Sequence, residues 1–247
     1  MKHKLSFFLL FLAAIALFAV QTLRAFGVVA FHADFFEKKG TIVLDAGHGG
    51  EDGGAVAING TLEKEINLAI ALELEKLLRQ NNFDVIMVRN SDCSVGDQSL
   101  GTIAERKRSD TKRRLHMIEE AGDCLFLSIH QNHFSQSKYS GAQVFYSANR
   151  PESAGLAEAV RKNIVDSLQP ENKRENKEAD SNIYILDHCQ VPAILVECGF
   201  LSNPEEAEKL CSESYQKEMA AAIYNGIIDY LQNGLLEEPQ RSDLANN

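Results

Sequence analysis

The sequence predicts an α/β domain built on a twisted, mostly parallel β-sheet with helices on both faces. Short apolar runs, each long enough for one buried strand, alternate along the chain with longer segments of helical periodicity. The first such unit comprises a strand at residues 42–44, a helix from Ile66 and a second strand at residues 83–88. Strands joined through a helix in this way run parallel, with a right-handed crossover. We expect the later elements to extend this sheet within a single domain.

The later elements follow from the same two patterns. In the helix that begins near Ile66, apolar residues recur every three or four positions, and charged residues occupy the opposite side. We expect further strands at residues 125–129, 142–146 and 192–196, helices at residues 112–121, 152–168 and 214–231, and a short helix opening at Pro204. The polar segments 91–110 and 169–180 are expected to be loops.

The composition excludes several classes of protein. With 25 Lys and Arg against 35 Asp and Glu, the formal net charge is −10, so the basic surface of a sequence-independent nucleic-acid binder is missing. The five cysteines are widely spaced and contain no CxxC pair. They therefore predict neither a disulfide framework nor a thiolate zinc site.

The N-terminus has the pattern of an export signal. Lys2 and Lys4 precede an unbroken apolar run from Phe7 to Val20. This run is short for a spanning helix, which needs about 20 apolar residues, but a second apolar stretch at residues 25–31 follows without a clear cleavage site. We therefore predict a signal-anchor that is kept in the mature protein, with a cleaved signal peptide as the alternative. In both cases the remainder of the chain is exported.

These observations divide the chain into four segments. No internal repeat or second folded domain is evident in the sequence. We assign residues 1–30 to the signal-anchor or signal peptide, 31–40 to a linker, 41–232 to the folded domain and 233–247 to a flexible polar tail.

Three of the predicted strands lead to ionisable residues. The first runs into a glycine-rich turn that carries His48, the strand at 125–129 leads to His130, and the strand at 192–196 leads to Glu197. Because the carboxyl ends of parallel strands share one edge of a sheet, we expect these side chains to lie close together. Glu63 or Glu65, at the start of the helix after the first strand, would bring a further carboxylate to this edge.

Two histidines and one carboxylate form a ligand set typical of catalytic zinc, in which the fourth position is left for water. The ion lowers the pKa of that water to about 7. A further carboxylate can then accept a proton from the water and pass it to a leaving amine. The alternative is that these residues are unrelated polar groups at loop tips.

Four sequence blocks resemble one known family. They are DAGHGG at residues 45–50, LEKEINL at 62–68, SIHQN at 128–132 and PAILVECGFLSN at 192–203. Together they are similar to the DPGHGG, EK-x-x-NL, SIHAN and PAxLVExGFLSN motifs of the zinc-dependent N-acetylmuramoyl-L-alanine amidases of the amidase 3 group. All four occur in order and cover the whole predicted domain.

The resemblance implies a role for four residues. His48, Glu63 and His130 match the zinc ligands of the family, and Glu197 matches its catalytic glutamate. Ala46 replaces the usual proline and Gln131 the usual alanine, but neither change removes a ligand. Asp45 and Asn132 are expected to orient the ligands, and His116, His133 and His188 are expected at the surface or in structural or cleft-lining positions. Glu65 is the alternative to Glu63 as a ligand, and Arg114 has no assigned role.

The resemblance also implies an activity: zinc-dependent hydrolysis of the amide bond between N-acetylmuramic acid and L-alanine in peptidoglycan, within one catalytic domain. A membrane anchor without a wall-binding repeat is similar to the sporulation-associated, germination-specific type, which trims spore-cortex peptidoglycan as the first step toward muramic-δ-lactam. The alternatives are a vegetative cell-wall amidase, a catalytically silent peptidoglycan-binding module, and a zinc peptidase that cuts within the stem peptide.

The expected partners follow from this activity. They are a peptidoglycan glycan strand with its stem peptide, the membrane through the N-terminal anchor, and an extracytoplasmic accessory protein that controls the enzyme. We expect the protein at the outer face of the cytoplasmic membrane, or secreted to the cell wall or spore-cortex space.

Overall fold

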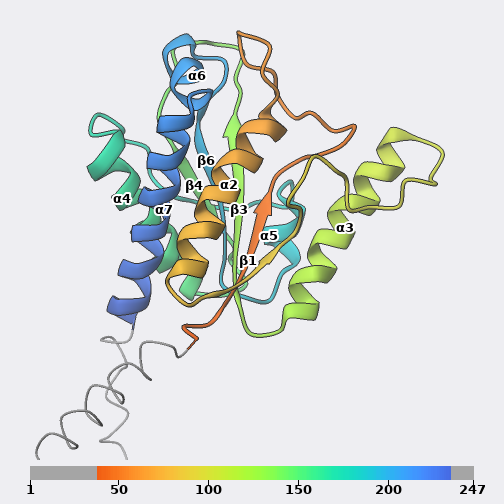
Figure 1. The fold of residues 1–247 in the computed structure, drawn as a ribbon, viewed down its shortest axis with the longest axis horizontal. Coiled ribbons are helices and arrows are strands. Elements are labelled where there is room, and N and C mark those ends of the chain that lie inside the picture. The colour runs from red at the N-terminus through yellow and green to blue at the C-terminus, as the bar shows by residue number, and fades with distance from the viewer. Residues whose placement is uncertain (1–37, 235–247) are drawn as a thin grey trace, which may run out of the picture. The chain divides into compact units, whose positions relative to one another are not determined.

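The computed structural model describes residues 38–234 (Figure 1). The elements follow in the order β1 (Thr41–Ala46), α2 (Glu63–Gln80), β2 (Asp84–Met87), α3 (Ile103–Ala121), β3 (Leu125–Asn132), β4 (Gln143–Tyr146), α4 (Glu152–Leu168), β5 (Lys177–Glu178), α5 (Tyr184–His188), β6 (Ala193–Phe200), α6 (Pro204–Leu210) and α7 (Glu213–Gly234). The predicted signal-anchor at 1–30 and nearly all of the predicted tail lie outside the described residues. Within residues 38–234, every helix is too short or too polar to cross a bilayer.

The strands form one six-stranded sheet in the order β2-β1-β3-β6-β4-β5. β1 is parallel to β2 and β3, and β6 is parallel to β3, so the predicted mostly parallel sheet is confirmed. β4 is antiparallel to β6. Residues 133–142, between β3 and β4, contain no helix that could return the chain to the opposite edge of the sheet, so β4 starts where β3 ends and runs back.

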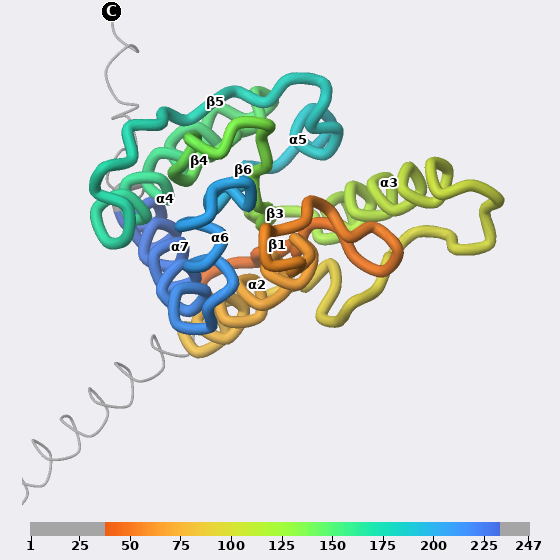
Figure 2. The backbone as a smooth tube through the Cα atoms, turned by 90° about the horizontal axis from the view of Figure 1, so that it is seen from above, coloured from red at the N-terminus to blue at the C-terminus, as the bar shows by residue number. Residues whose placement is uncertain are grey.

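Helices cover both faces of the sheet, as predicted (Figure 2). Side chains of a strand alternate between the two faces. Ile42 and Leu44 of β1 therefore belong to the core cluster that also contains side chains of α2, α4 and α7, whereas Val43 belongs to the cluster with side chains of α3 and α5. Phe126 of β3 is fully buried in the second of these clusters. The carboxyl ends of β1, β3 and β6 thus emerge between two helical layers.

The structure corrects several element boundaries. Helix α3 begins at Ile103, so the predicted loop at 91–110 is shorter than expected. Thr102 caps this helix in a reciprocal pair with Glu105, whose backbone N–H donates to Thr102 Oγ1 at 3.2 Å. The predicted loop at 169–180 contains the two-residue strand β5, the short helix α5 was not predicted, and α7 continues to Gly234, past the end predicted at residue 231.

Helices α4 and α7 approach each other closely at Gly226. A Cβ added there would lie 2.5 Å from Val160 Cα, which is backbone and cannot move aside. We expect Gly226→Ala to lower the free energy of unfolding by about 2 kcal/mol, because overpacking outweighs the better helix propensity of alanine. Chemical denaturation measures the change.

Gly155 of α4 is the matched control for this substitution. A Cβ at Gly155 would lie 3.6 Å from Tyr230 Cε2, which is ordinary van der Waals contact. Gly155→Ala should therefore raise the free energy of unfolding by about 0.5 kcal/mol through helix propensity. Equal effects of the two substitutions would contradict the proposed close approach at Gly226.

Candidate active site

The loop after β1 is held in an unusual conformation by two arginines. His48 has φ of 62°, in the left-handed region that non-glycine residues seldom adopt. Arg114 Nη2 donates to the His48 carbonyl at 2.7 Å, and Arg89 Nη2 donates to the Gly47 carbonyl at 2.9 Å. Arg114 is itself paired with Asp45. These buried contacts over-determine the backbone at His48 and fix where its imidazole points.

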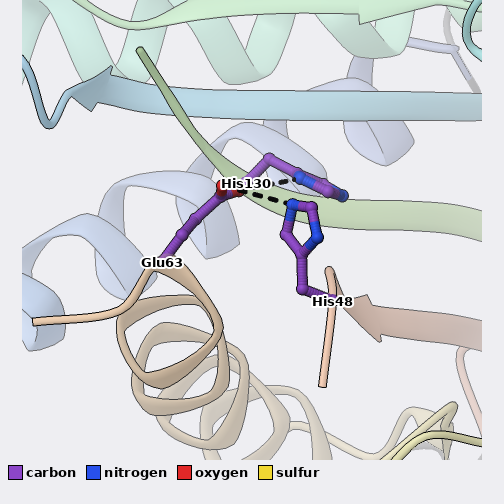
Figure 3. Close-up of side chains that lie close together, drawn as sticks. All are labelled: His48, Glu63 and His130. Carbon is purple, nitrogen blue, oxygen red and sulfur yellow. Dashed lines mark hydrogen bonds and ion pairs between the residues drawn. The ribbon is translucent and has the colours of Figure 1, made fainter. Parts of the chain in front are cut away.

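His48, Glu63 and His130 converge on one point (Figure 3). His48 comes from the loop after β1, Glu63 is the first residue of α2, and His130 lies on β3. His48 Nε2 lies 3.2 Å from Glu63 Oε2, and His130 Nδ1 lies 3.0 Å from Glu63 Oε1. One ligand atom from each residue lies within 4.8 Å of the others. The three side chains can therefore share one metal ion.

Further hydrogen bonds hold the Glu63 carboxylate in place. Backbone N–H groups of Ala55 and Gln131 donate to its two oxygens at 2.9 and 3.1 Å, and Asn67 Nδ2 donates at 3.2 Å. Burial opposes the charge of Glu63, but its bonds to His130 and His48 outweigh burial and hold its pKa well below the usual range. Glu63 is thus a charged carboxylate at neutral pH, and its oxygen atoms can act as metal ligands.

Asp52 orients His48 from the other side of the ring. Asp52 Oδ2 lies 2.9 Å from His48 Nδ1, which leaves Nε2 directed at Glu63. Burial favours the neutral imidazole, but hydrogen bonds to Asp52 and Glu63 prevail and raise the pKa of His48 to about 9. In the sequence, only its position four residues after His48 indicated that Asp52 could contact this histidine.

Glu197 lies beside this group on β6. It is paired in register with His130 of the neighbouring strand β3. Its Oε2 is buried and has no hydrogen-bond partner among the described residues. Burial, reinforced by the negative charge of Glu63, raises the pKa of Glu197 to about 7 despite the opposing effect of the two histidines. A carboxyl group with this pKa can both accept and donate a proton near neutral pH.

The four residues predicted from the sequence share one region, and most of the secondary candidates lie elsewhere. A cavity of about 460 Å³ is lined by His48, His130 and Glu197 at the sheet and by residues of α3 and α5 on its flanks. Glu65 is exposed and accepts a hydrogen bond from the Leu62 N–H, so the structure favours Glu63. The side chains outside the cavity lining are those of His116, Asn132, His133 and His188, whereas Asp45 and Arg114 line it.

Asn67 and Gln131 were not predicted as site residues. Asn67 is fully buried and its Nδ2 donates both to Glu63 Oε1 and to the Gly47 carbonyl, at 3.2 Å each. Gln131 Nε2 donates to Asn67 Oδ1 at 3.1 Å. The position of Asn67 in the EKEINL block could have indicated that it contacts Glu63, because it lies one helical turn after Glu63.

We expect Asn67→Ala to weaken metal binding by about 10- to 100-fold, because the Glu63 carboxylate loses a donor that orients it. Metal titration of the metal-free protein measures this change. Asn81→Ala is a matched control, because Asn81 caps the other end of α2 and contacts the Leu77 carbonyl, far from the site. An unchanged metal affinity in Asn67→Ala would show that Asn67 does not position Glu63.

Comparison with known proteins identifies the family. The sequence profile described as N-acetylmuramoyl-L-alanine amidase matches residues 42–229. The chain belongs to this amidase family. A germination-specific N-acetylmuramoyl-L-alanine amidase of Bacillus subtilis is 36% identical to it over 189 residues, which are 76% of this chain and 78% of the relative.

Solved structures agree with this assignment. The CwlD amidase from Clostridioides difficile, in complex with the GerS lipoprotein, is 40% identical with a TM-score of 0.75, and the match covers 78% of this chain and 98% of that one. The amidase AmiC2 of Nostoc punctiforme is 31% identical with a TM-score of 0.66, covering 78% and 97%. The family and the peptidoglycan amidase activity expected from the four sequence blocks are thereby confirmed.

Proposed function

We propose that the amidase binds Zn²⁺ through His48, Glu63 and His130, and that Glu197 is its general base and acid. The observation that carries this proposal is the convergence of two imidazole nitrogens and one carboxylate oxygen within 4.8 Å, beside a buried carboxylate. The bond hydrolysed is the amide between N-acetylmuramic acid and L-alanine.

The donor set fits zinc. Two imidazoles and one carboxylate are common ligands of catalytic zinc, and three protein ligands leave a position open. Asp52 on the outer nitrogen of His48 is the kind of contact that fixes ring orientation at such sites. Glu197 Oε2, which is buried and accepts no hydrogen bond from the described part of the chain, is suited to a proton from a water molecule in the cavity.

In the proposed mechanism, zinc supplies Lewis-acid activation of the amide carbonyl and of the attacking water. Glu197 takes a proton from this water as the water attacks the carbonyl carbon. The C–N bond then breaks, and Glu197 returns the proton to the departing nitrogen of L-alanine. The products are a free lactyl carboxylate on the sugar and a stem peptide with a free N-terminus. A pKa near neutrality allows Glu197 to perform both transfers.

We further propose that the natural substrate is spore-cortex peptidoglycan. This proposal is supported by the similarity to a germination-specific amidase of Bacillus subtilis. The similar CwlD amidase was solved with the GerS lipoprotein, and we propose an extracytoplasmic accessory protein for this chain too. Export through the segment at residues 1–30 would bring the amidase to its substrate. A vegetative wall amidase is the alternative for the substrate.

Product analysis tests the activity and its metal dependence. The protein is incubated with muropeptides, with zinc or with a chelator, and the products are identified by mass spectrometry. We expect free stem peptides that begin at L-alanine, formed only with zinc. Cuts within the stem peptide would instead indicate a peptidase, and a zinc-loaded protein that cleaves nothing would indicate a binding module.

A further inference from the structure

An aromatic cluster lies beyond the catalytic residues, past an irregularity in the pairing of β3 with β6. Past the pair formed by His130 and Glu197, the next pair on β3 and β6 is Asn132 and Phe200. Phe134 and Tyr139, from the loop after β3, complete the cluster: their ring centroids are 5.0 Å apart at 90°, and those of Tyr139 and Phe200 are 6.2 Å apart. We call Phe134, Tyr139 and Phe200 the aromatic ledge.

The ledge is anchored to the end of β6. The Phe134 backbone N–H donates to Ser202 Oγ at 3.1 Å, and Asn203 Nδ2 donates to the Tyr139 carbonyl at 3.2 Å. Both contacts join the loop after β3 to the turn that follows Glu197. The ledge therefore holds a defined position relative to the site of the reaction, because both are built on the carboxyl ends of the same two strands.

Phe134 is 48% exposed, although a buried position would stabilise a phenylalanine. Cations surround the other two rings: Lys138 Nζ lies 5.4 Å from the centroid of Tyr139, and Arg174 Cζ lies 4.6 Å from that of Phe200. A half-exposed, anchored aromatic ring with the hydrogen-bond donors of Lys138 and Arg174 nearby is suited to bind a ligand that has one apolar face and polar edges. A pyranose ring is such a ligand, because its axial C–H groups form an apolar face and its hydroxyl and acetamido groups lie at the rim.

We propose that the aromatic ledge binds the N-acetylhexosamine that flanks the scissile muramic acid, by stacking of the sugar on Phe134. Lys138 donates hydrogen bonds to the oxygen atoms at the rim of that sugar. The inference rests on the proposed function, and it makes a glycan strand a better substrate than an isolated muramoyl peptide. The charge of Lys138 also favours a strand that carries carboxylates.

Two substrates distinguish an effect on sugar binding at the ledge from an effect on the catalytic residues. One is N-acetylmuramic acid that carries a stem peptide and no flanking sugar, and the other is a strand of several disaccharides with stem peptides. With the full-length zinc-loaded chain, we expect Phe134→Ala to raise KM for the strand by about 10-fold, the size of a single aromatic contact, and to leave kcat unchanged. The kinetics of the short substrate should not change.

Further variants and a binding measurement sharpen the test. Phe134→Trp should keep the low KM for the strand, whereas Phe134→Leu, which is apolar but has no ring, should behave like Phe134→Ala. Peptide-free glycan oligomers should inhibit the wild type competitively, with an inhibition constant raised by the same factor in Phe134→Ala. Ile103→Ala removes another exposed apolar side chain, 57% exposed at the start of α3, and should change none of these values.

The outcomes also distinguish this inference from the proposed function. A wild-type enzyme that cleaves both substrates establishes the amidase, whatever the variants do. If Phe134→Ala then changes both substrates equally, or neither, the ledge is not a sugar-binding site. Unchanged kinetics on both substrates together with the loss of a protein partner would assign the ledge to protein binding and overturn the proposal.

Discussion

Glu197→Gln should lower kcat by about 10³-fold, within the range usually contributed by general acid–base catalysis. Glutamine keeps the shape of the side chain but cannot accept a proton from water at neutral pH. Because the proposed zinc ligands are His48, Glu63 and His130, zinc should remain bound in the variant. Steady-state kinetics on muropeptides, together with the zinc content of the purified protein, measure the two quantities separately.

Glu51→Gln is the control for this substitution. Glu51 lines the same cavity as Glu197 but forms an ion pair with Arg106. Its replacement should leave kcat within about 3-fold of the wild type, since surface ion pairs contribute little. A Glu197→Gln enzyme that keeps full activity would remove Glu197 from the mechanism. A variant that loses its zinc would instead make Glu197 a ligand.

Gly47→Ala should abolish zinc binding at concentrations that saturate the wild type, a loss of affinity of at least about 100-fold. A Cβ at this position would lie 2.1 Å from His130 Nε2, in the space that the imidazole occupies. The backbone cannot move away, because the Gly47 N–H donates to the Ile129 carbonyl at 3.0 Å and its own carbonyl accepts from Arg89 and Asn67. His130 must therefore leave its contact with Glu63.

Isothermal titration with zinc measures this loss, and Gly53→Ala controls for the general effect of alanine in the loop. Neither glycine has a positive φ, so alanine causes no backbone strain at either position. A Cβ at Gly53 would have its nearest neighbour, Leu62 Cδ2, at 3.4 Å. We expect Gly53→Ala to bind zinc like the wild type. Equal affinities in the two variants would contradict the steric explanation.

Parts of the fold were predictable because their signals are local. The strand at residues 42–44 is a continuous apolar run, and β1 is buried on both faces. The first turns of α3 were missed because this helix has few buried residues, which are Arg114, Leu115 and Ile118. Its apolar periodicity is therefore weak, although Thr102 and Glu105 have the spacing of a capping box. Capping is a weaker signal than periodicity, but here it was the informative one.

The residue types at the ends of the strands are predictable from the sequence, because apolar runs and glycine-rich turns are properties of neighbouring residues. The hydrogen bonds that hold these strand ends in place are visible only in the folded structure. Arg114 reaches the carbonyl of His48 from α3, and Gln131 reaches Asn67 from β3. Such contacts join residues more than 60 positions apart in the chain. They depend on how each helix is rotated against the sheet, which is set by packing across the whole core.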